Sequence, residues 1–308
     1  MSAASATALS PARAAERAPP PVYHPPVLTL GNVLLYVAIF VISVFFLFPI
    51  YLIFLIGFTD PKYTIFSGRP PLIPPSFTLS NLQQGLFGAG SPFLGSMYLS
   101  LEVAFFVGAL ALLIGIPTAY GLSRLGSRLA YGVTTVLFIV NMVPSITIAI
   151  PISVQFIDLG QAIGVNLYGS WITIGLAQEL LALPVTIFLL VGAFQGLPRD
   201  LENQARVDGA GRFKAIYGNL VPLIVPALVA AFLLSWMLSW DESTFALILY
   251  NPATSATLPV NIFLSFTGRG SPTIGVAFSC IATIPVIVLT VFLQRFLKGE
   301  DLAAGVRG

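Results

Sequence analysis

The segment from Val33 to Phe58 reads VLLYVAIFVISVFFLFPIYLIFLIGF and contains no charged residue. A helix that crosses the hydrocarbon core of a bilayer needs roughly 20 consecutive apolar residues, and this segment exceeds that length. Because lipid offers no hydrogen bonds to the backbone, the peptide groups of such a segment must pair internally, as they do in a helix. The segment therefore predicts a transmembrane helix near the start of the sequence.

Five further segments meet the same criterion of length and polarity. They run from Met97 to Tyr120, Ala130 to Val154, Trp171 to Phe194, about Val221 to Trp240, and Thr273 to Gln294. Of the 308 residues, 56% are hydrophobic and 8% are charged, and the mean hydropathy is +0.92. Soluble domains carry about 25% charged residues, so this composition excludes a water-soluble surface. The expected fold is an all-α polytopic membrane protein with six transmembrane helices.

The distribution of basic residues predicts the orientation, because short cytoplasmic loops carry an excess of Lys and Arg. With the N-terminus inside, eleven of the 14 basic residues fall on the cytoplasmic side and three on the outer side. Both termini are therefore expected in the cytoplasm. We expect residues 1–30 to be a disordered cytoplasmic tail, residues 31–298 to be the transmembrane domain, and residues 299–308 to be a cytoplasmic C-terminal tail.

The remaining composition excludes several kinds of site. There is one cysteine, Cys280, and one histidine, His24, so neither a disulfide framework nor a Cys/His metal site is expected within the chain. The net charge of +2 does not favour nucleic acid as a partner. A phosphate-binding P-loop needs a lysine directly after glycine, and none of the three lysines follows one. We therefore expect no enzyme activity and no cofactor bound by this chain.

A charged segment, LPRDLENQARVDGAGRFK, occupies residues 197–214 between the fourth and fifth apolar segments. Its pattern predicts a short amphipathic helix that is broken at Gly209 and restarts toward the membrane. Pro222 then begins the next membrane helix, a position where proline costs no needed hydrogen bond. On these grounds alone, the segment also fits an ordinary solvated loop.

The order of residues in this segment resembles the EAA loop of ABC importer permeases. That loop has the pattern E-A-A, two variable residues, D-G-A, then apolar positions and two prolines four apart. Asp208-Gly209-Ala210 matches D-G-A, and Pro222 and Pro226 match the prolines. The triplet itself reads Asn203-Gln204-Ala205, with the acid displaced to Glu202.

The resemblance implies that residues 198–214 form a cytoplasmic coupling helix, which sits in a cleft of a separate ATPase that binds ATP and Mg²⁺. The residues that it assigns to ATPase coupling are Glu202, Asn203, Ala205, Asp208, Gly209 and Ala210. Asn203 stands where the family has the acid that pairs with a basic ATPase residue. Glu202, about 100° around the helix axis, is a candidate to replace that acid.

Three other segments are similar to carbohydrate-type permeases: Pro75–Leu82, Trp240-Asp241-Glu242, and Leu302–Gly308. The last of these, with the six-span count, resembles the second permease subunit of the maltose type. The resemblance implies a binding-protein-dependent importer in the cytoplasmic (inner) membrane of a prokaryote. Its other parts would be a second permease subunit, two ATPase subunits and an extracellular or periplasmic solute-binding protein. The expected function is to form half of the translocation path for a mono- or oligosaccharide.

Four residues in or at the ends of the expected spans are candidates for the translocation path or an outer gate: Glu179, Trp240, Asp241 and Glu242. A carboxylate at membrane depth is costly, so each acid is expected to face a cavity or a polar partner. Glu179 lies about eight residues into the fourth span. A structural hydrogen bond between helices is the alternative role for it.

Two alternative functions remain open. The same class of importer could carry a polyol phosphate, an amino acid or a peptide, although the absence of basic residues inside the expected spans favours a neutral solute. An intramembrane enzyme would need a nucleophile–base pair or metal ligands at depth. The expected spans contain no histidine, and their one cysteine is Cys280. They therefore offer neither a nucleophile–base pair nor a set of metal ligands.

Overall fold

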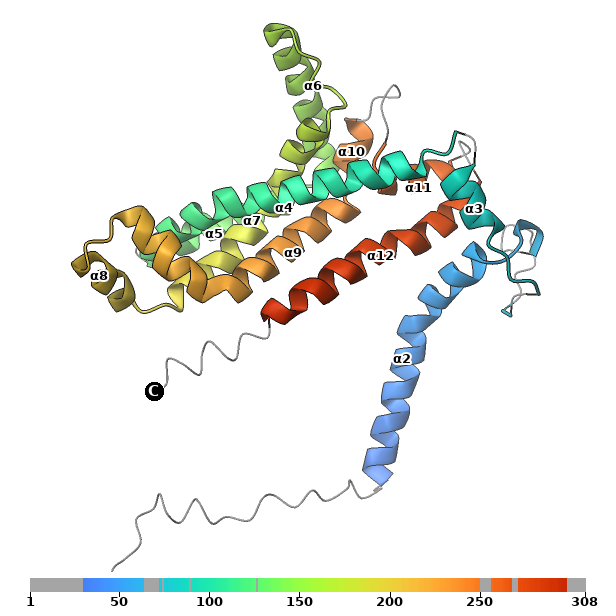
Figure 1. Cartoon of the computed structure of the whole chain (residues 1–308), viewed down its shortest axis with the longest axis horizontal. Helices are drawn as coiled ribbons and strands as arrows, with labels where there is room; N and C mark the ends of the chain where they lie inside the picture. The colour runs from blue at the N-terminus through green and yellow to red at the C-terminus, as the bar shows by residue number, and fades with distance from the viewer. Residues whose placement is uncertain are drawn as a thin grey trace, which may run out of the picture. The chain divides into compact units, whose positions relative to one another are not determined.

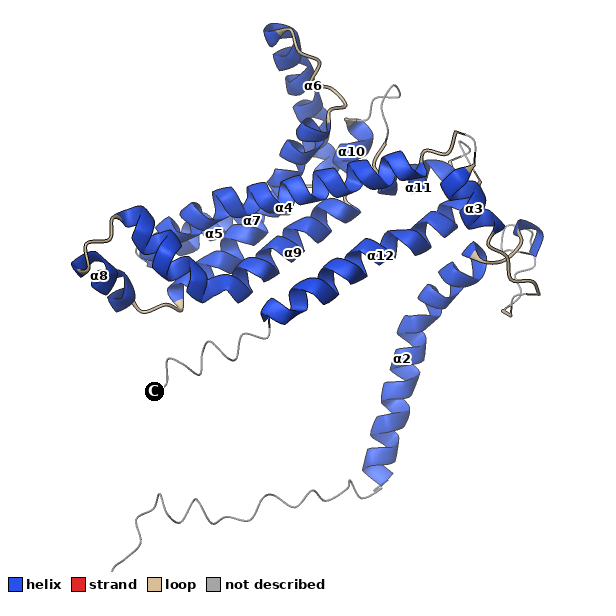
Figure 2. Cartoon of the chain, in the orientation of Figure 1, coloured by secondary structure: helices blue, strands red, loops and turns tan. Residues whose placement is uncertain are grey.

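The structure, a computed structural model, describes residues 30–63, 72–73, 75–88, 90–125, 127–249, 256–267 and 271–297. The predicted C-terminal tail and all but the last residue of the predicted N-terminal tail lie outside the described residues. Within the described ranges every regular element is helical, apart from one isolated bridge between Thr59 and Phe77 (Figure 2). The prediction of an all-α protein is confirmed.

Six helices in the described part of the chain are long and apolar enough to cross a membrane, which confirms the predicted number. They are α2 (Leu30–Gly57), α4 (Phe93–Arg124), α6 (Ser145–Ile163), α7 (Trp171–Gln195), the run Lys214–Asp241, and α12 (Pro272–Leu297). The run Lys214–Asp241 begins with a π-helical segment, η3 (Lys214–Leu220), and a 3₁₀ turn, η4 (Val221–Ile224), before α9 (Val225–Asp241).

The prediction of one continuous third span from Ala130 to Val154 is wrong. The chain instead forms α5 (Ser127–Asn141), a break, and then α6. Pro144 precedes α6 with an extended ψ of 128°. Proline has no N–H to continue a helix, and it drives the residue before it away from helical geometry. The span is therefore α6, which continues to Ile163 and ends at Gly164 with φ +71°.

The shorter elements connect these helices. They are η1 (Pro61–Tyr63), α3 (Ser80–Phe87), α8 (Arg199–Val207), α10 (Thr244–Ile248) and α11 (Leu258–Phe266). The chain divides into two units, residues 1–50 and residues 51–308, and the architecture that follows belongs to the second. Within that unit, α8 and the last turns of α4 lie at one end of the bundle, and α3 and α11 lie at the other (Figure 1).

The helices α4, α7 and α9 form the centre of the bundle, where small residues let them pack closely. A Cβ atom at Gly115 of α4 would lie 2.7 Å from the Thr186 Cγ2 atom of α7. A Cβ atom at Gly108 would lie 2.8 Å from the Phe232 ring of α9. Such small residues at helix contacts are typical of membrane bundles, where packing rather than hydrophobic burial drives association.

We therefore expect Gly115→Val to destabilise the bundle by about 1–3 kcal/mol through overpacking. Thr186 cannot move aside freely, because its hydroxyl is hydrogen-bonded to the Ser235 hydroxyl at 2.6 Å. The matched control is Gly121→Val on the same helix, where an added Cβ meets no atom within 4 Å. Thermal unfolding in detergent should show a lower midpoint for Gly115→Val alone. Equal shifts for both variants would contradict the packing argument.

Candidate functional site

The helix α8 forms where the sequence predicts a short amphipathic helix. Its N-cap residue is Pro198, and the first turn carries Asp200 and Glu202 whereas the last carries Arg206. This order of charge complements the helix dipole. On the apolar side, Ala205 is buried and Leu201 packs against the cluster that includes Phe194 and Leu220. The helix is therefore fixed to the bundle along one side.

Gly209 ends α8 in a left-handed conformation, with φ +79°, which glycine adopts without strain. The Gly209 N–H donates to the Arg206 carbonyl at 3.1 Å, and the Ala210 N–H donates to the Ala205 carbonyl at 2.9 Å. This pair of bonds defines a Schellman motif, which supplies hydrogen-bond donors to carbonyls of the last turn that lack a partner within the helix. The predicted break at Gly209 is confirmed. A Cβ atom there would meet no atom within 4 Å, so the backbone conformation, not packing, requires glycine.

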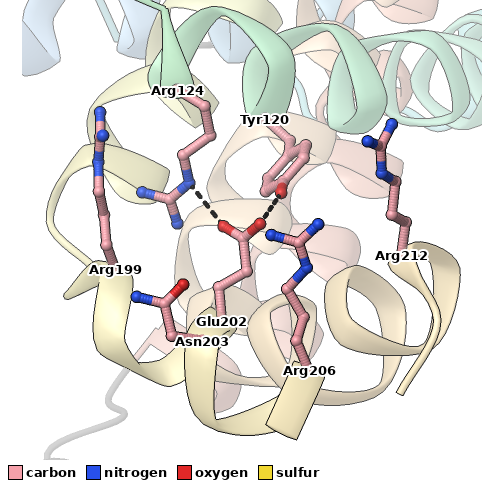
Figure 3. Close-up of a pocket in the computed structure, with 7 residues that line it drawn as sticks. All are labelled: Tyr120, Arg124, Arg199, Glu202, Asn203, Arg206 and Arg212. Atoms are coloured by element: carbon pink, nitrogen blue, oxygen red, sulfur yellow. Dashed lines mark hydrogen bonds and ion pairs between the residues drawn. The ribbon is translucent and has the colours of Figure 1, made fainter. Parts of the chain in front are cut away.

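The carboxylate of Glu202 is directed at the end of α4. It accepts a hydrogen bond from the Tyr120 hydroxyl at 2.6 Å and forms an ion pair with the Arg124 Nε atom at 3.2 Å (Figure 3). The side chains of Arg124 and Glu202 are only 16% and 18% exposed. The contact joins residues about 80 positions apart. The role of Glu202 as a substitute for the missing acid at Asn203 stays a prediction, and its carboxylate is engaged within the chain.

A pocket of about 450 Å³ surrounds this ion pair. It is lined by Tyr120, Arg124, Arg199, Glu202, Asn203, Arg206 and Arg212 (Figure 3). Asn203 therefore shares the pocket with Glu202. The other residues assigned to ATPase coupling are placed differently: Ala205 is buried in the bundle, Ala210 is half-buried, and Asp208 and Gly209 are exposed at the tip of the loop.

The candidates for the translocation path do not form one site. Glu179 of α7 is buried, and neither of its carboxylate oxygens has a hydrogen-bond partner among the described residues. The hydrogen bonds between helices come instead from its neighbour Gln178. The Gln178 side chain donates to a Glu242 carboxylate oxygen at 3.3 Å and accepts from the Ser239 hydroxyl at 2.5 Å. Sequence reasoning did not single out Ser239, although it is a polar residue in an apolar run.

The three residues of Trp240-Asp241-Glu242 have different surroundings. Trp240 stacks on Trp236 with ring centroids 5.0 Å apart. Asp241 is exposed and, with Trp240, lines a cavity of about 410 Å³ between α9, α11 and α12. Glu242 points to α10, where its carboxylate accepts hydrogen bonds from the backbone N–H groups of Thr244 at 2.6 Å and Phe245 at 3.0 Å.

These contacts predict that Glu242 stabilises the start of α10. We expect Glu242→Ala to loosen α10 by about 1 kcal/mol, as the loss of a helix N-cap does. Asp241→Ala is the matched control, because the Asp241 carboxylate makes no hydrogen bond with the described residues. Hydrogen exchange of residues 244–248 should accelerate in Glu242→Ala only. If hydrogen exchange of residues 244–248 were unchanged in this variant, the hydrogen bonds of Glu242 would not be needed to stabilise α10.

Six helices of spanning length, with a short charged helix that ends at Gly209 between the fourth and fifth of them, are features of a multi-pass membrane protein. Residues 111–299 match the family described as "Binding-protein-dependent transport system inner membrane component". The chain belongs to this family, and the resemblance inferred from the loop is confirmed.

Two relatives agree with this family, and a solved structure shares the fold. The sulfoquinovosyl glycerol transport system permease protein SmoH of Agrobacterium fabrum is 31% identical, over 90% of this chain and 95% of the relative. The trehalose transport system permease protein SugB of Mycobacterium tuberculosis is 31% identical, over 85% and 93%. A chain of a bacterial ABC transporter involved in the import of the acidic polysaccharide alginate shares the fold, with a TM-score of 0.68, 21% identity, and coverage of 89% of this chain and 100% of that one.

Proposed function

We propose that this chain forms half of the translocation path of a sugar importer and that a separate ATPase drives it through residues 198–214. The observation that carries the proposal is the Schellman-closed end of α8 at Gly209. It presents an exposed tip at one end of the bundle, in a chain whose relatives are named as sugar permeases (Figure 1).

Residues 198–214 have two parts with different surroundings: an exposed tip around Gly209, and a base that contacts α4 and the bundle. At the tip, Val207 is 87% exposed, although it is apolar. Together with Asp208 and Gly209, it offers a surface for an ATPase cleft. At the base, Glu202 and the buried Ala205 join α8 to α4 and to the bundle. A displacement imposed on the tip would therefore reach the spans through α4.

The mechanism requires partners with different affinities for two states. ATP and Mg²⁺ bind to the two partner ATPase subunits, whose closure moves the coupling segments of this chain and of a second permease subunit. Docking of a loaded solute-binding protein favours the same change only if it binds the outward-open state more tightly. The solved alginate transporter in complex with a pentasaccharide-bound periplasmic protein, which has a TM-score of 0.61 and 18% identity, shares the fold of this chain.

The chemistry of the spans favours a neutral cargo. Within the described helices, the basic residues of α4 and α12 lie in the last turn, and α7 and α9 contain none. A binding path for a polyol phosphate or another anion would be expected to carry buried cations. A mono- or oligosaccharide instead needs neutral polar groups that hydrogen-bond its hydroxyls.

The proposed topology gives a direct prediction. A cysteine at Phe87, which is 78% exposed at the end that carries α3, should react with an impermeant maleimide added to intact cells. A cysteine at Arg128, which is exposed in the first turn of α5, should react only after the cells are opened. The native Cys280 is buried and serves as the background control. The reverse pattern of labelling would contradict the proposed orientation.

The function itself is tested by reconstitution with the partner subunits and the solute-binding protein in vesicles. We expect ATP-dependent accumulation of the labelled sugar that the binding protein recognises. Uptake of an amino acid, a peptide or a polyol phosphate in place of sugars would overturn the proposal that the cargo is a sugar. Uptake that needs no ATPase subunit would overturn the coupling mechanism.

A further inference from the structure

The pocket at the end of α4 carries positive charge that the described residues do not neutralise. Four of its lining residues are arginines, Arg124, Arg199, Arg206 and Arg212, and Glu202 is the single carboxylate among the described residues that line it. Arginine stays charged at any physiological pH. Four positive charges against one negative charge leave an excess of three, and Arg124 already engages the carboxylate.

The four arginines line one pocket because of where the backbone places them. Arg199 and Arg206 lie on one face of α8 with Glu202, since spacings of three and four residues bring side chains to the same side. Arg212 comes from the segment after Gly209, and Arg124 comes from the last turn of α4. In Figure 3, the Arg124 and Arg206 side chains lie next to the Glu202 carboxylate below α4, and Arg199 and Arg212 stand on either side of them.

The Arg124 guanidinium has two buried donors without a hydrogen-bond acceptor among the described residues: Nε, which makes only the ion pair with Glu202, and Nη2. A buried donor left unpaired is costly, more so when it is charged. The pocket is therefore suited to an added acceptor with negative charge and several oxygens. A phosphate group has both, and the planar guanidinium fork matches its geometry.

The surroundings of the pocket favour a phosphate that belongs to a lipid. Tyr120 and Arg124 are in the last two turns of a spanning helix, the level at which aromatic and basic side chains meet lipid headgroups. Apolar side chains border the arginines: Leu125 follows Arg124 and is 44% exposed, and Phe213 follows Arg212 and is 81% exposed. A soluble anion would gain nothing from these apolar neighbours, whereas acyl chains would cover them.

We propose that this pocket binds the phosphate headgroup of an anionic phospholipid of the cytoplasmic leaflet, and phosphatidylglycerol is the probe that tests it. The site rests on the topology of the proposed function. Basic pockets on the cytoplasmic side of membrane helices are suited to such headgroups. A bound lipid would join α4, α8 and the segment after Gly209 through one anion, and so would hold the coupling segment against the membrane.

The test uses the complete importer, purified with its partner subunits and equilibrated with equal amounts of phosphatidylglycerol and phosphatidylcholine. Native mass spectrometry then counts the retained lipids. The test variant is Arg199→Gln with Arg212→Gln, because both side chains are exposed and neither forms an ion pair within the described chain. The matched control is Arg295→Gln in the last turn of α12, which does not line the pocket.

We expect the parental importer to prefer phosphatidylglycerol and this preference to fall about fivefold for each arginine removed. The control should keep the parental preference. Equal retention of both lipids, or an unchanged preference in the double variant, would overturn the proposal. Displacement of the lipid by inorganic phosphate or glycerol 3-phosphate would assign the pocket to a soluble phosphate instead. Binding that appears only after the ATPase subunits are stripped would mean that a protein carboxylate occupies the pocket.

The lipid assay needs no transport, so its outcome is separate from that of the proposed function. A parental importer that shows no lipid preference but normal ATP-dependent uptake would overturn only the lipid site. Normal lipid retention without any uptake would count only against the importer function.

Discussion

Replacing Gly209 by valine is expected to abolish transport while the spans remain inserted and the subunits remain assembled. Gly209 has φ +79°, and a β-branched residue in that region is strained by about 1–3 kcal/mol. The strain opposes the Schellman bonds to Ala205 and Arg206, so the end of α8 and the exposed tip must rearrange. ATP hydrolysis by the importer should then no longer respond to the loaded binding protein, as measured in vesicles with and without that protein.

The chain provides a matched control two residues away. Gly211 is likewise open, with no atom within 4 Å of an added Cβ, and it does not have a positive φ. Gly211→Val should therefore transport at close to the parental rate. Gly209→Asn should keep part of the activity, because asparagine tolerates the left-handed conformation better than valine does. Parental transport by Gly209→Val would remove the assignment of residues 198–214 as the coupling element. Equal loss in both valine variants would point to side-chain bulk rather than backbone conformation.

The spans could be predicted because length and lack of charge are sufficient signals for crossing a bilayer. The break at Pro144 could not be read from proline itself. Pro117, Pro151 and Pro184 all lie inside continuous helices, whereas Pro144 separates α5 from α6. Neighbouring helices decide whether the freed backbone groups of a proline are satisfied in place. That information is tertiary, so the sequence pattern predicts a third span that begins too early in the chain.

The loop shows the same division between local and tertiary information. The helix and its end at Gly209 follow from the local pattern, since glycine is the residue that closes a helix in the left-handed conformation. The partners of Glu202 do not follow from the local pattern. Tyr120 and Arg124 come within reach only because α4 continues to Arg124, beyond the predicted end at Tyr120. Glu242 is a similar case, because its role as a cap depends on the short helix α10 that follows it.

The contact between Glu202 and α4 leads to the second large effect, a loss of coupling when its charge is removed. Glu202→Gln keeps an acceptor for the Tyr120 hydroxyl but leaves Arg124 without its ion pair, and the charge excess of the pocket rises from three to four. A hydrogen-bonded charged group in this setting contributes about 1.5–3 kcal/mol. We expect amide exchange in α8 to rise roughly tenfold or more, because α8 is released from α4.

Arg124→Gln should have a similar effect, and the double variant should cost little more than either single variant, because the contact can be lost only once. Arg128→Gln is the control, since Arg128 is exposed and does not line the pocket. Exchange of residues 199–207 in the assembled importer, followed by mass spectrometry, measures each variant. Additive effects would show that the two residues act independently.

If this contact carries the motion of the ATPase to α4, uptake should fall to the same level in both single variants and in the double variant. Faster exchange with undiminished uptake would instead limit the contact to a structural role and leave the buried Ala205 side of α8 as the route of coupling.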